Sequence, residues 1–222
     1  MKGMTDTADL TLDEIRVLLA PAIAENAAFD GWGAAARDMA ADMNGVDKDV
    51  AALAFRGGAV DMIDAWFASV DAAMVATLSP DALAAMKIRQ RITALVEARL
   101  TATAPHREAL RRALAILALP QNIATAARLG WRSVDAMWRA AGDTATDYNH
   151  YTKRAMLFAV YGATITVFLD DESEGHADTS AFLARRIDGI MRIEKAKANI
   201  ARRSLRAPSL SRFVGRLRYP VV

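Results

Sequence analysis

The sequence of 222 residues has no cysteine and contains few glycines, prolines and histidines. The missing cysteine excludes disulfides and thiolate metal sites. Only 12 glycines and 6 prolines interrupt a chain whose apolar share is 53% and is dominated by alanine. That balance favours helices that pack closely together. Because the apolar share is this high and only 24% of the residues are charged, we expect a folded chain with a sizeable core rather than a disordered one.

The sequence also lacks an apolar run long enough to cross a bilayer. The longest charge-free run covers residues 155–169 and contains Thr164 and Thr166, whereas a spanning helix needs about 20 apolar residues. Residues 1–9 hold one lysine, two aspartates and no apolar run, so they do not resemble a signal peptide. We therefore expect a soluble protein of a bacterial-type cytoplasm.

Basic residues are concentrated at the end of the chain. Residues 192–222 contain nine basic residues and one acid, which leaves 19 basic and 25 acidic residues in the rest. In this basic tail, residues 209–219 combine an apolar stripe at helical spacing with arginines off the stripe, namely Leu210, Phe213, Val214 and Leu217 with Arg212, Arg216 and Arg218. Such a segment suits an anionic membrane surface, where each arginine contributes roughly 1 kcal/mol. We expect a peripheral position on the inner membrane; docking of the stripe on the protein's own body is the alternative.

Helical periodicity covers nearly the whole chain, and no convincing strand alternation is present. We expect an all-α protein with helices at about 12–26, 34–43, 47–55, from 59, 81–100, 105–119, 122–141 with a break near Gly130, 147–169, and from Asp178. Three short helices before a longer one resemble the arrangement of tetracycline-repressor-like regulators. The last two helices are predicted to form a homodimer surface.

The expected helix-turn-helix region carries the wrong charge for DNA. Between residues 33 and 55 only Arg37 and Lys48 are basic, whereas four residues are acidic: Asp38, Asp42, Asp47 and Asp49. A recognition helix must neutralise phosphates and bring polar side chains to base edges. We therefore expect a degenerate helix-turn-helix and no nucleic-acid partner. A tetracycline-repressor-like transcriptional regulator that senses a hydrophobic ligand is the alternative function.

The second half of the chain contains a more specific pattern. The segments LPQNIATAARL, VDAMWRAAGDTATDYNHYTKRAMLFAVY and DTSAFLARRI resemble the lipid-binding accessory family of coenzyme Q (ubiquinone) biosynthesis, the ninth of the Coq proteins. The N-terminal segments GWGAAA and AFRGGAVDMIDAWF are similar to the same family's helix-turn-helix-like region. The resemblance covers about residues 12–191.

This resemblance implies a tetracycline-repressor-like fold that has lost DNA binding, homodimerisation and a C-terminal helix that meets the membrane. It also implies a surface patch that docks a ring-modifying hydroxylase. Carried over by position, the patch contains Asp147, Tyr148, Asn149, His150, Tyr151 and Arg154. The family usually has tryptophan where this chain has His150. Independently of the family, we expect Lys153 and Arg154 to pair with acids such as Asp143 or Asp147.

A hydrophobic pocket for an isoprenoid or a phospholipid is also implied. Apolar residues of the central helices are the candidate lining, namely Leu117, Met137, Trp138, Leu157, Tyr161 and Phe168. Taken one by one, such residues are more often plain core than the wall of a ligand pocket. We expect no other cofactor, no metal site and no catalytic residue, because the three histidines are scattered and no nucleotide-binding or di-iron motif is present.

The predicted organisation has three parts: a helix-turn-helix-like region at 10–56, a lipid-binding and dimerisation domain at 57–203, and the membrane-contacting tail at 204–222. The expected function is to shelter ubiquinone intermediates and present them to a hydroxylase at the membrane, not to catalyse a reaction. A scaffold that organises enzymes without binding lipid is a further alternative.

Overall fold

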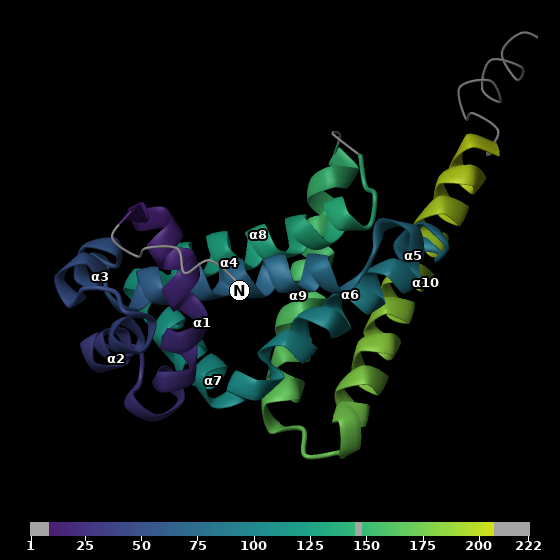
Figure 1. Ribbon diagram of the computed structural model, residues 1–222. Helices are drawn as coiled ribbons and strands as arrows, with labels where there is room; N and C mark the ends of the chain where they lie inside the picture. Colours follow the sequence, from purple (N-terminus) through teal and green to yellow (C-terminus); the bar gives the residue numbers. More distant parts are fainter. Residues whose placement is uncertain (1–8, 145–147, 207–222) are drawn as a thin grey trace, which may run out of the picture. The chain divides into compact units, whose positions relative to one another are not determined.

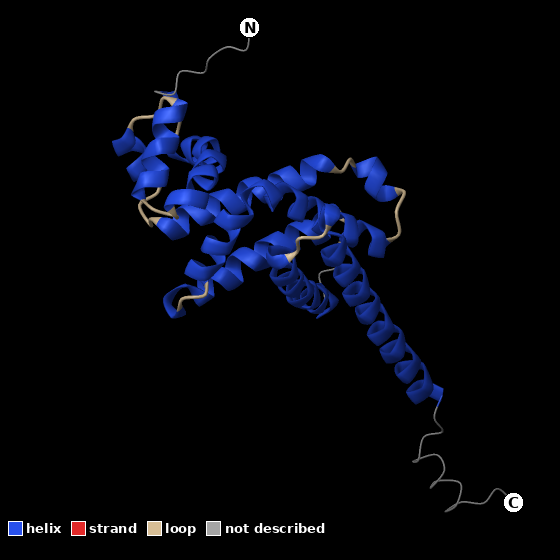
Figure 2. Cartoon of the chain, turned by 90° about the horizontal axis from the view of Figure 1, so that it is seen from below, coloured by secondary structure: helices blue, strands red, loops and turns tan. Residues whose placement is uncertain are grey.

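The computed structural model describes residues 9–144 and 148–206, with the backbone alone for residues 148, 149, 191 and 193–206. All the regular elements in these ranges are helices (Figures 1 and 2), which confirms the predicted all-α class. The chain divides into two compact units, residues 1–183 and residues 184–222. The three predicted domain boundaries stay predictions.

Three helices with clear end signals begin the fold. Helix α1 (Leu12–Asp30) starts at a capping box, in which the Thr11 hydroxyl accepts from the Glu14 amide and the Glu14 carboxylate accepts from the Thr11 amide. Helix α2 (Ala34–Asn44) ends at Gly45, whose φ of 66° favours glycine. Helix α3 (Lys48–Ala54) is capped by Asp47. These helix-turn-helix-like elements follow the sequence prediction closely.

Two tryptophans join this N-terminal part to the central helices. Trp32 and Trp66 are both buried, with ring centroids 5.3 Å apart. Trp66 belongs to α4 (Ala59–Thr77), and the indole Nε1 of Trp32 donates to the Ala109 carbonyl on α7 (Arg107–Leu117) at 2.9 Å. The buried, tilted ring contact and the hydrogen bond fix the first helices on the body of the unit.

The single helix predicted for residues 81–100 is wrong. The chain forms a short α5 (Pro80–Ala84), breaks, and restarts as α6 (Ile88–Thr103). Arg91 stabilises the break, because its guanidinium donates to the carbonyls of Ala84, Met86 and Ala141 at 3.0, 2.9 and 2.8 Å. The bonds to Ala84 and Met86 satisfy carbonyls at the break, and the bond to Ala141 satisfies a carbonyl at the end of α8.

Helix α7 is preceded by a short 3₁₀ turn, η2 (Ala104–His106), and a second turn, η3 (Pro120–Asn122), leads into α8 (Ile123–Ala140). The break expected near Gly130 is wrong, since α8 runs through it without interruption. Gly130 is instead required by packing: a Cβ there would lie 2.4 Å from the Phe158 ring. The glycine thus marks a close approach to α9 rather than a helix end.

Helix α9 (Tyr148–Asp170) is followed by the turn η4 (Glu174–His176) and by α10 (Ala177–Arg206). Asp171 holds this turn. Its carboxylate accepts from the amide and the hydroxyl of Ser173 and from the amide and the hydroxyl of Thr179. The carboxylate thereby satisfies amides that have no helical partner where α10 begins.

Candidate functional site

An apolar cleft of about 430 Å³ lies among the central helices of the first unit. Helices α8 and α9 contribute most of its wall, and α4, α6 and α7 contribute the remainder. The lining residues are Phe67, Arg99, Leu114, Leu117, Ala118, Ile123, Ala126, Ala127, Gly130, Ser133, Phe158, Tyr161, Gly162 and Ile165. Its size and mostly apolar lining are those of a small-molecule site.

The rim of the cleft exposes apolar side chains. Phe158 on α9 is 37% exposed and Ile123 on α8 is 58% exposed. Gly130 leaves room for the Phe158 ring across α8, and Gly162 on α9 leaves open space, since a Cβ there would meet nothing within 4 Å. Gly130 therefore lets the Phe158 ring pack against α8, and Gly162 leaves the α9 wall open.

The floor of the cleft is polar and fully buried. Arg99 on α6 is 1% exposed, and its Nε donates to the Asp71 carboxylate of α4 at 2.7 Å. Its Nη2 donates to the Ser133 hydroxyl at 3.1 Å, and its Nη1 donates to the Tyr161 hydroxyl. Ser133 in turn donates to Asp71 at 3.0 Å. This buried network joins α4, α6, α8 and α9, and three of its members line the cleft.

Electrostatic interactions keep Tyr161 neutral and Arg99 charged. Burial raises the pKa of Tyr161 and Arg99 opposes that rise, but the pKa stays above its ordinary value, so the hydroxyl is neutral near pH 7. Burial by itself lowers the pKa of Arg99, but Tyr161 and Asp71 outweigh it and the pKa is raised. The guanidinium also lies 5.2 Å from the ring centroids of both Phe67 and Tyr161. Arg99 is thus a permanent, compensated cation.

The six residues predicted to bind lipid divide into two groups. Leu117 and Tyr161 line the cleft. Met137, Leu157 and Phe168 are buried but lie outside its lining, and Trp138 is half-buried under the Lys153 ammonium, 5.6 Å from the ring. The sequence analysis missed Arg99, Ser133, Phe158 and Gly162. A signal for Arg99 was present, because it continues the apolar stripe of α6 formed by Ile92, Leu95 and Val96.

The predicted docking patch is described in part. Asp147 and the side chains of Tyr148 and Asn149 lie outside the described residues. Tyr151 is 62% exposed, stacks on Trp131 with centroids 6.4 Å apart, and meets the His150 ring edge-on at 5.0 Å. An aromatic cluster with Tyr151 exposed and Trp131 and His150 half-buried therefore lies where α8 and the start of α9 meet.

Arg154 has a different place from its neighbours in that patch. It is 1% exposed and donates to Asp135 at 2.6 Å and to Asp143 at 3.1 Å. Lys153 pairs with Asp143 at 3.0 Å, so the predicted pairing of both cations with Asp143 is confirmed. Burial raises the pKa of Asp143, but bonds from Lys153 and Arg154 outweigh burial and lower it. Arg154 therefore supports the patch from beneath.

The residues predicted to contact the membrane lie outside the described residues. They are Leu210, Arg212, Phe213, Val214, Arg216, Leu217 and Arg218. Within residues 9–144 and 148–206, no helix has the length and apolarity needed to cross a membrane. The same ranges hold no cluster of three or more side chains suited to a metal ion.

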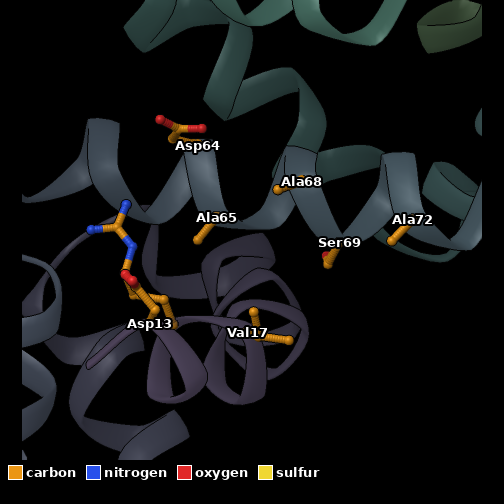
Figure 3. A pocket seen from close by; sticks show the side chains of 8 residues that line it. Asp13, Val17, Asp64, Ala65, Ala68, Ser69 and Ala72 are labelled. Carbon is orange, nitrogen blue, oxygen red and sulfur yellow. The ribbon is translucent and has the colours of Figure 1, made fainter. Parts of the chain in front are cut away.

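A second hollow lies between α1 and α4 (Figure 3) and measures about 300 Å³. Val17 of α1 faces small residues of α4, Ala65, Ala68 and Ser69. Its Arg16 is held by the Ala54 carbonyl at 2.9 Å. We assign no ligand to this groove, because small side chains dominate it and Arg16 is already engaged.

The α2–α3 region has its basic residues next to acids. Its two basic residues form ion pairs with neighbouring acids, Arg37 with Asp38 at 2.7 Å and Lys48 with Asp42 at 2.8 Å. The exposed side chains of the two helices include Met39, Met43, Val50 and Leu53. These contacts leave little positive charge for phosphates.

Comparison with known proteins finds a family match for two of the helices that line the cleft. Residues 123–194 match the COQ9 family, and this segment supplies the α8 and α9 walls of the cleft. The mitochondrial ubiquinone biosynthesis protein COQ9 of Homo sapiens is 44% identical over 105 residues, which cover 47% of this chain and 33% of the human protein. The COQ9 protein of Drosophila melanogaster is 27% identical over 193 residues, covering 85% of this chain and 59% of the relative. The match thus spans about a third of the human relative's length.

A solved structure supports the fold. The TetR transcriptional regulator of Nitrosomonas europaea superimposes with a TM-score of 0.63 and 25% sequence identity, covering 79% of this chain and 97% of that protein. The predicted tetracycline-repressor-like fold is therefore confirmed. Together the two comparisons confirm the resemblance seen in the sequence: the chain carries a COQ9 family region, at residues 123–194, on a TetR-like helical fold.

Proposed function

We propose that this chain is a lipid-binding accessory protein of ubiquinone biosynthesis. It shelters an isoprenoid quinone intermediate in the cleft between α8 and α9 and presents it to a ring-modifying hydroxylase at the membrane surface. The observation that carries the proposal is the coincidence of the COQ9 family region with the walls of the apolar cleft. We assign the chain no catalytic step of its own.

The physical need for such a protein follows from the hydrophobic effect. A polyprenyl tail exposed to water is costly at about 25 cal/mol per Å² of apolar surface. The cleft offers an apolar wall with Phe158 and Ile123 at its rim. A tail longer than the cleft could continue over this rim. The half-buried Trp131 of α8 and the exposed Tyr151 of α9, which stack on each other, are the place for an enzyme partner.

Mass spectrometry of the full chain purified from its host, with organic extraction of bound molecules, tests the proposal. The expected result is a co-purifying quinone, isoprenoid or phospholipid. Gly162→Leu places a side chain in open space within the cleft and should lower ligand occupancy at least several-fold. Ala163→Leu is the matched control, because Ala163 is exposed on the same helix but does not line the cleft. A ligand-free wild-type protein would favour the scaffold alternative.

The fold of the Nitrosomonas europaea regulator supports a second candidate, a transcriptional regulator with a hydrophobic effector. A mobility-shift experiment with the DNA upstream of the chain's own gene separates the two functions. We expect no salt-dependent binding, since Arg37 and Lys48 are already paired with acids. Specific binding at physiological salt would favour the regulator.

A further inference from the structure

The buried floor of the cleft has hydrogen-bond donors in excess. A guanidinium carries five N–H groups and accepts nothing. Arg99 directs one N–H each to Asp71, Ser133 and Tyr161. Among the hydrogen bonds formed by the described residues, two N–H groups of Arg99 are left without an acceptor.

The Tyr161 hydroxyl adds a further donor. Its oxygen accepts from Arg99, and its own hydrogen has no acceptor among the bonds of the described part of the chain. Ser133 keeps one unused lone pair, because its oxygen accepts one bond from Arg99 and its hydrogen is directed to Asp71. The three unused donors, two N–H groups of Arg99 and the Tyr161 O–H, therefore outnumber the remaining lone pairs on the Ser133 and Tyr161 oxygens.

The charge of the floor is already balanced. Asp71 lies 2.7 Å from Arg99 and neutralises it, while the Asp71 carboxylate itself does not line the cleft. A ligand that entered with a full negative charge would have to be desolvated without an uncompensated cation to receive it. A neutral group with lone pairs loses less on desolvation and uses the spare donors.

We propose that the cleft receives a neutral amphiphile head first, with carbonyl or ether oxygens accepting hydrogen bonds from Arg99 and Tyr161 and with its apolar part along α8 and α9. The inference rests on the proposed function, since it assumes that the cleft binds lipid. It adds the orientation of the ligand and the chemistry of its polar end. Alcohols, amines and anionic lipids of the same chain length bind more weakly than quinone-like acceptors.

A pair of ligands that differ only in the polar end tests this chemistry. Isothermal titration calorimetry compares a decyl-substituted dimethoxybenzoquinone with decylbenzene on the full-length wild-type chain. The benzoquinone offers carbonyl and ether acceptors, and decylbenzene offers none. We expect the quinone to bind roughly tenfold more tightly, the effect of one or two hydrogen bonds to buried donors.

A single substitution tests the position. Tyr161→Phe keeps the ring, removes the O–H donor and releases the Arg99 N–H that the hydroxyl accepted. Because the donor at the position of the hydroxyl is lost, we expect the variant to reduce quinone affinity roughly fivefold and to leave decylbenzene affinity within twofold. The decylbenzene titration is the control for a general change in the cleft. Thermal unfolding shows whether the variant folds; if it does not, the two-ligand comparison on the wild-type chain decides alone.

The outcomes separate this inference from the proposed function. Equal affinity of the wild type for both probes overturns the acceptor preference while lipid binding stands. A quinone preference that Tyr161→Phe leaves unchanged overturns the placement of the head on the floor. If neither probe binds, the proposed function fails and the inference fails with it.

Discussion

At the residue scale, Asp171 is the clearest case of one side chain organising a turn. Four hydrogen bonds, two from Ser173 and two from Thr179, reach its carboxylate. The bonds from Ser173 and Thr179 lower the pKa of Asp171 far below its ordinary value. The folded state therefore favours the charged form of Asp171 more strongly than the unfolded state does.

Asp171→Asn should make stability less dependent on pH. A lowered folded-state pKa means that the carboxylate stabilises the fold above the unfolded pKa of about 4 and loses this contribution as pH falls below that value. We expect the variant to be less stable than the wild type at pH 7 and the difference to narrow between about pH 4 and pH 3. Urea unfolding at each pH measures it, and a difference that stays constant with pH would contradict the role of the carboxylate.

The sequence predicts which apolar residues are buried but not which of them line the cleft. Apolar character on a helical stripe identifies Leu157 and Phe168 as buried, and they are buried. It cannot separate them from Leu117 and Tyr161, which line the cleft, because a cavity wall and a core contact require the same side chains. The position of a void depends on how whole helices pack, and no single stripe specifies it.

At the element scale, α8 and α9 form the cleft through two glycines that differ in their surroundings. Gly130 faces the Phe158 ring at a distance too short for any Cβ, whereas Gly162 faces open space. Both interrupt apolar helices, where glycine is less favourable than alanine by roughly 1 kcal/mol. Their opposite environments give a matched pair of substitutions.

Gly162→Ala should raise the stability of the chain by up to about 1 kcal/mol, a shift of roughly 2–4 °C in Tm. Gly130→Ala should give less stabilisation or a net loss, because the new methyl group displaces the Phe158 ring from α8. Differential scanning calorimetry measures both variants. A larger gain from Gly130→Ala than from Gly162→Ala would contradict the packing described for α8 and α9.

Helix boundaries were predictable where the chain itself supplies the cap. Gly45 marks the C-terminal end of α2 and Asp47 marks the start of α3, in the sequence and in the structure. The break between α5 and α6 was not predictable, because Arg91 stabilises it partly through Ala141, a carbonyl fifty residues away along the chain. A local sequence pattern predicts a cap that lies in the same segment, but it does not predict a hydrogen bond to a residue far away along the chain.

At the scale of the whole molecule, the chain separates its charges. The acidic α2–α3 region holds its two cations in ion pairs, while residues 192–222 contain nine basic residues and one acid. The separation favours an anionic partner for the tail alone. A membrane surface is the partner that we propose.

Arg212→Glu, Arg216→Glu and Arg218→Glu combined should lower binding of the full chain to vesicles that contain phosphatidylglycerol by at least tenfold. Each arginine near such a surface contributes roughly 1 kcal/mol, and the glutamates add repulsion. Vesicle flotation measures the effect at low and at physiological salt. Neutral phosphatidylcholine vesicles are the control, and equal binding of wild type and variant to both lipids would show that the tail does not meet the membrane electrostatically.

The tilted ring pair of Trp32 and Trp66 gives the molecule an intrinsic optical marker. Two indoles with centroids 5.3 Å apart in a dry core couple their electronic transitions and are shielded from aqueous quenchers. The other two tryptophans, Trp131 and Trp138, are half-buried on α8. Red-edge emission and acrylamide quenching therefore report the α8 pair, while the near-ultraviolet dichroism of the coupled pair reports whether the first four helices remain assembled.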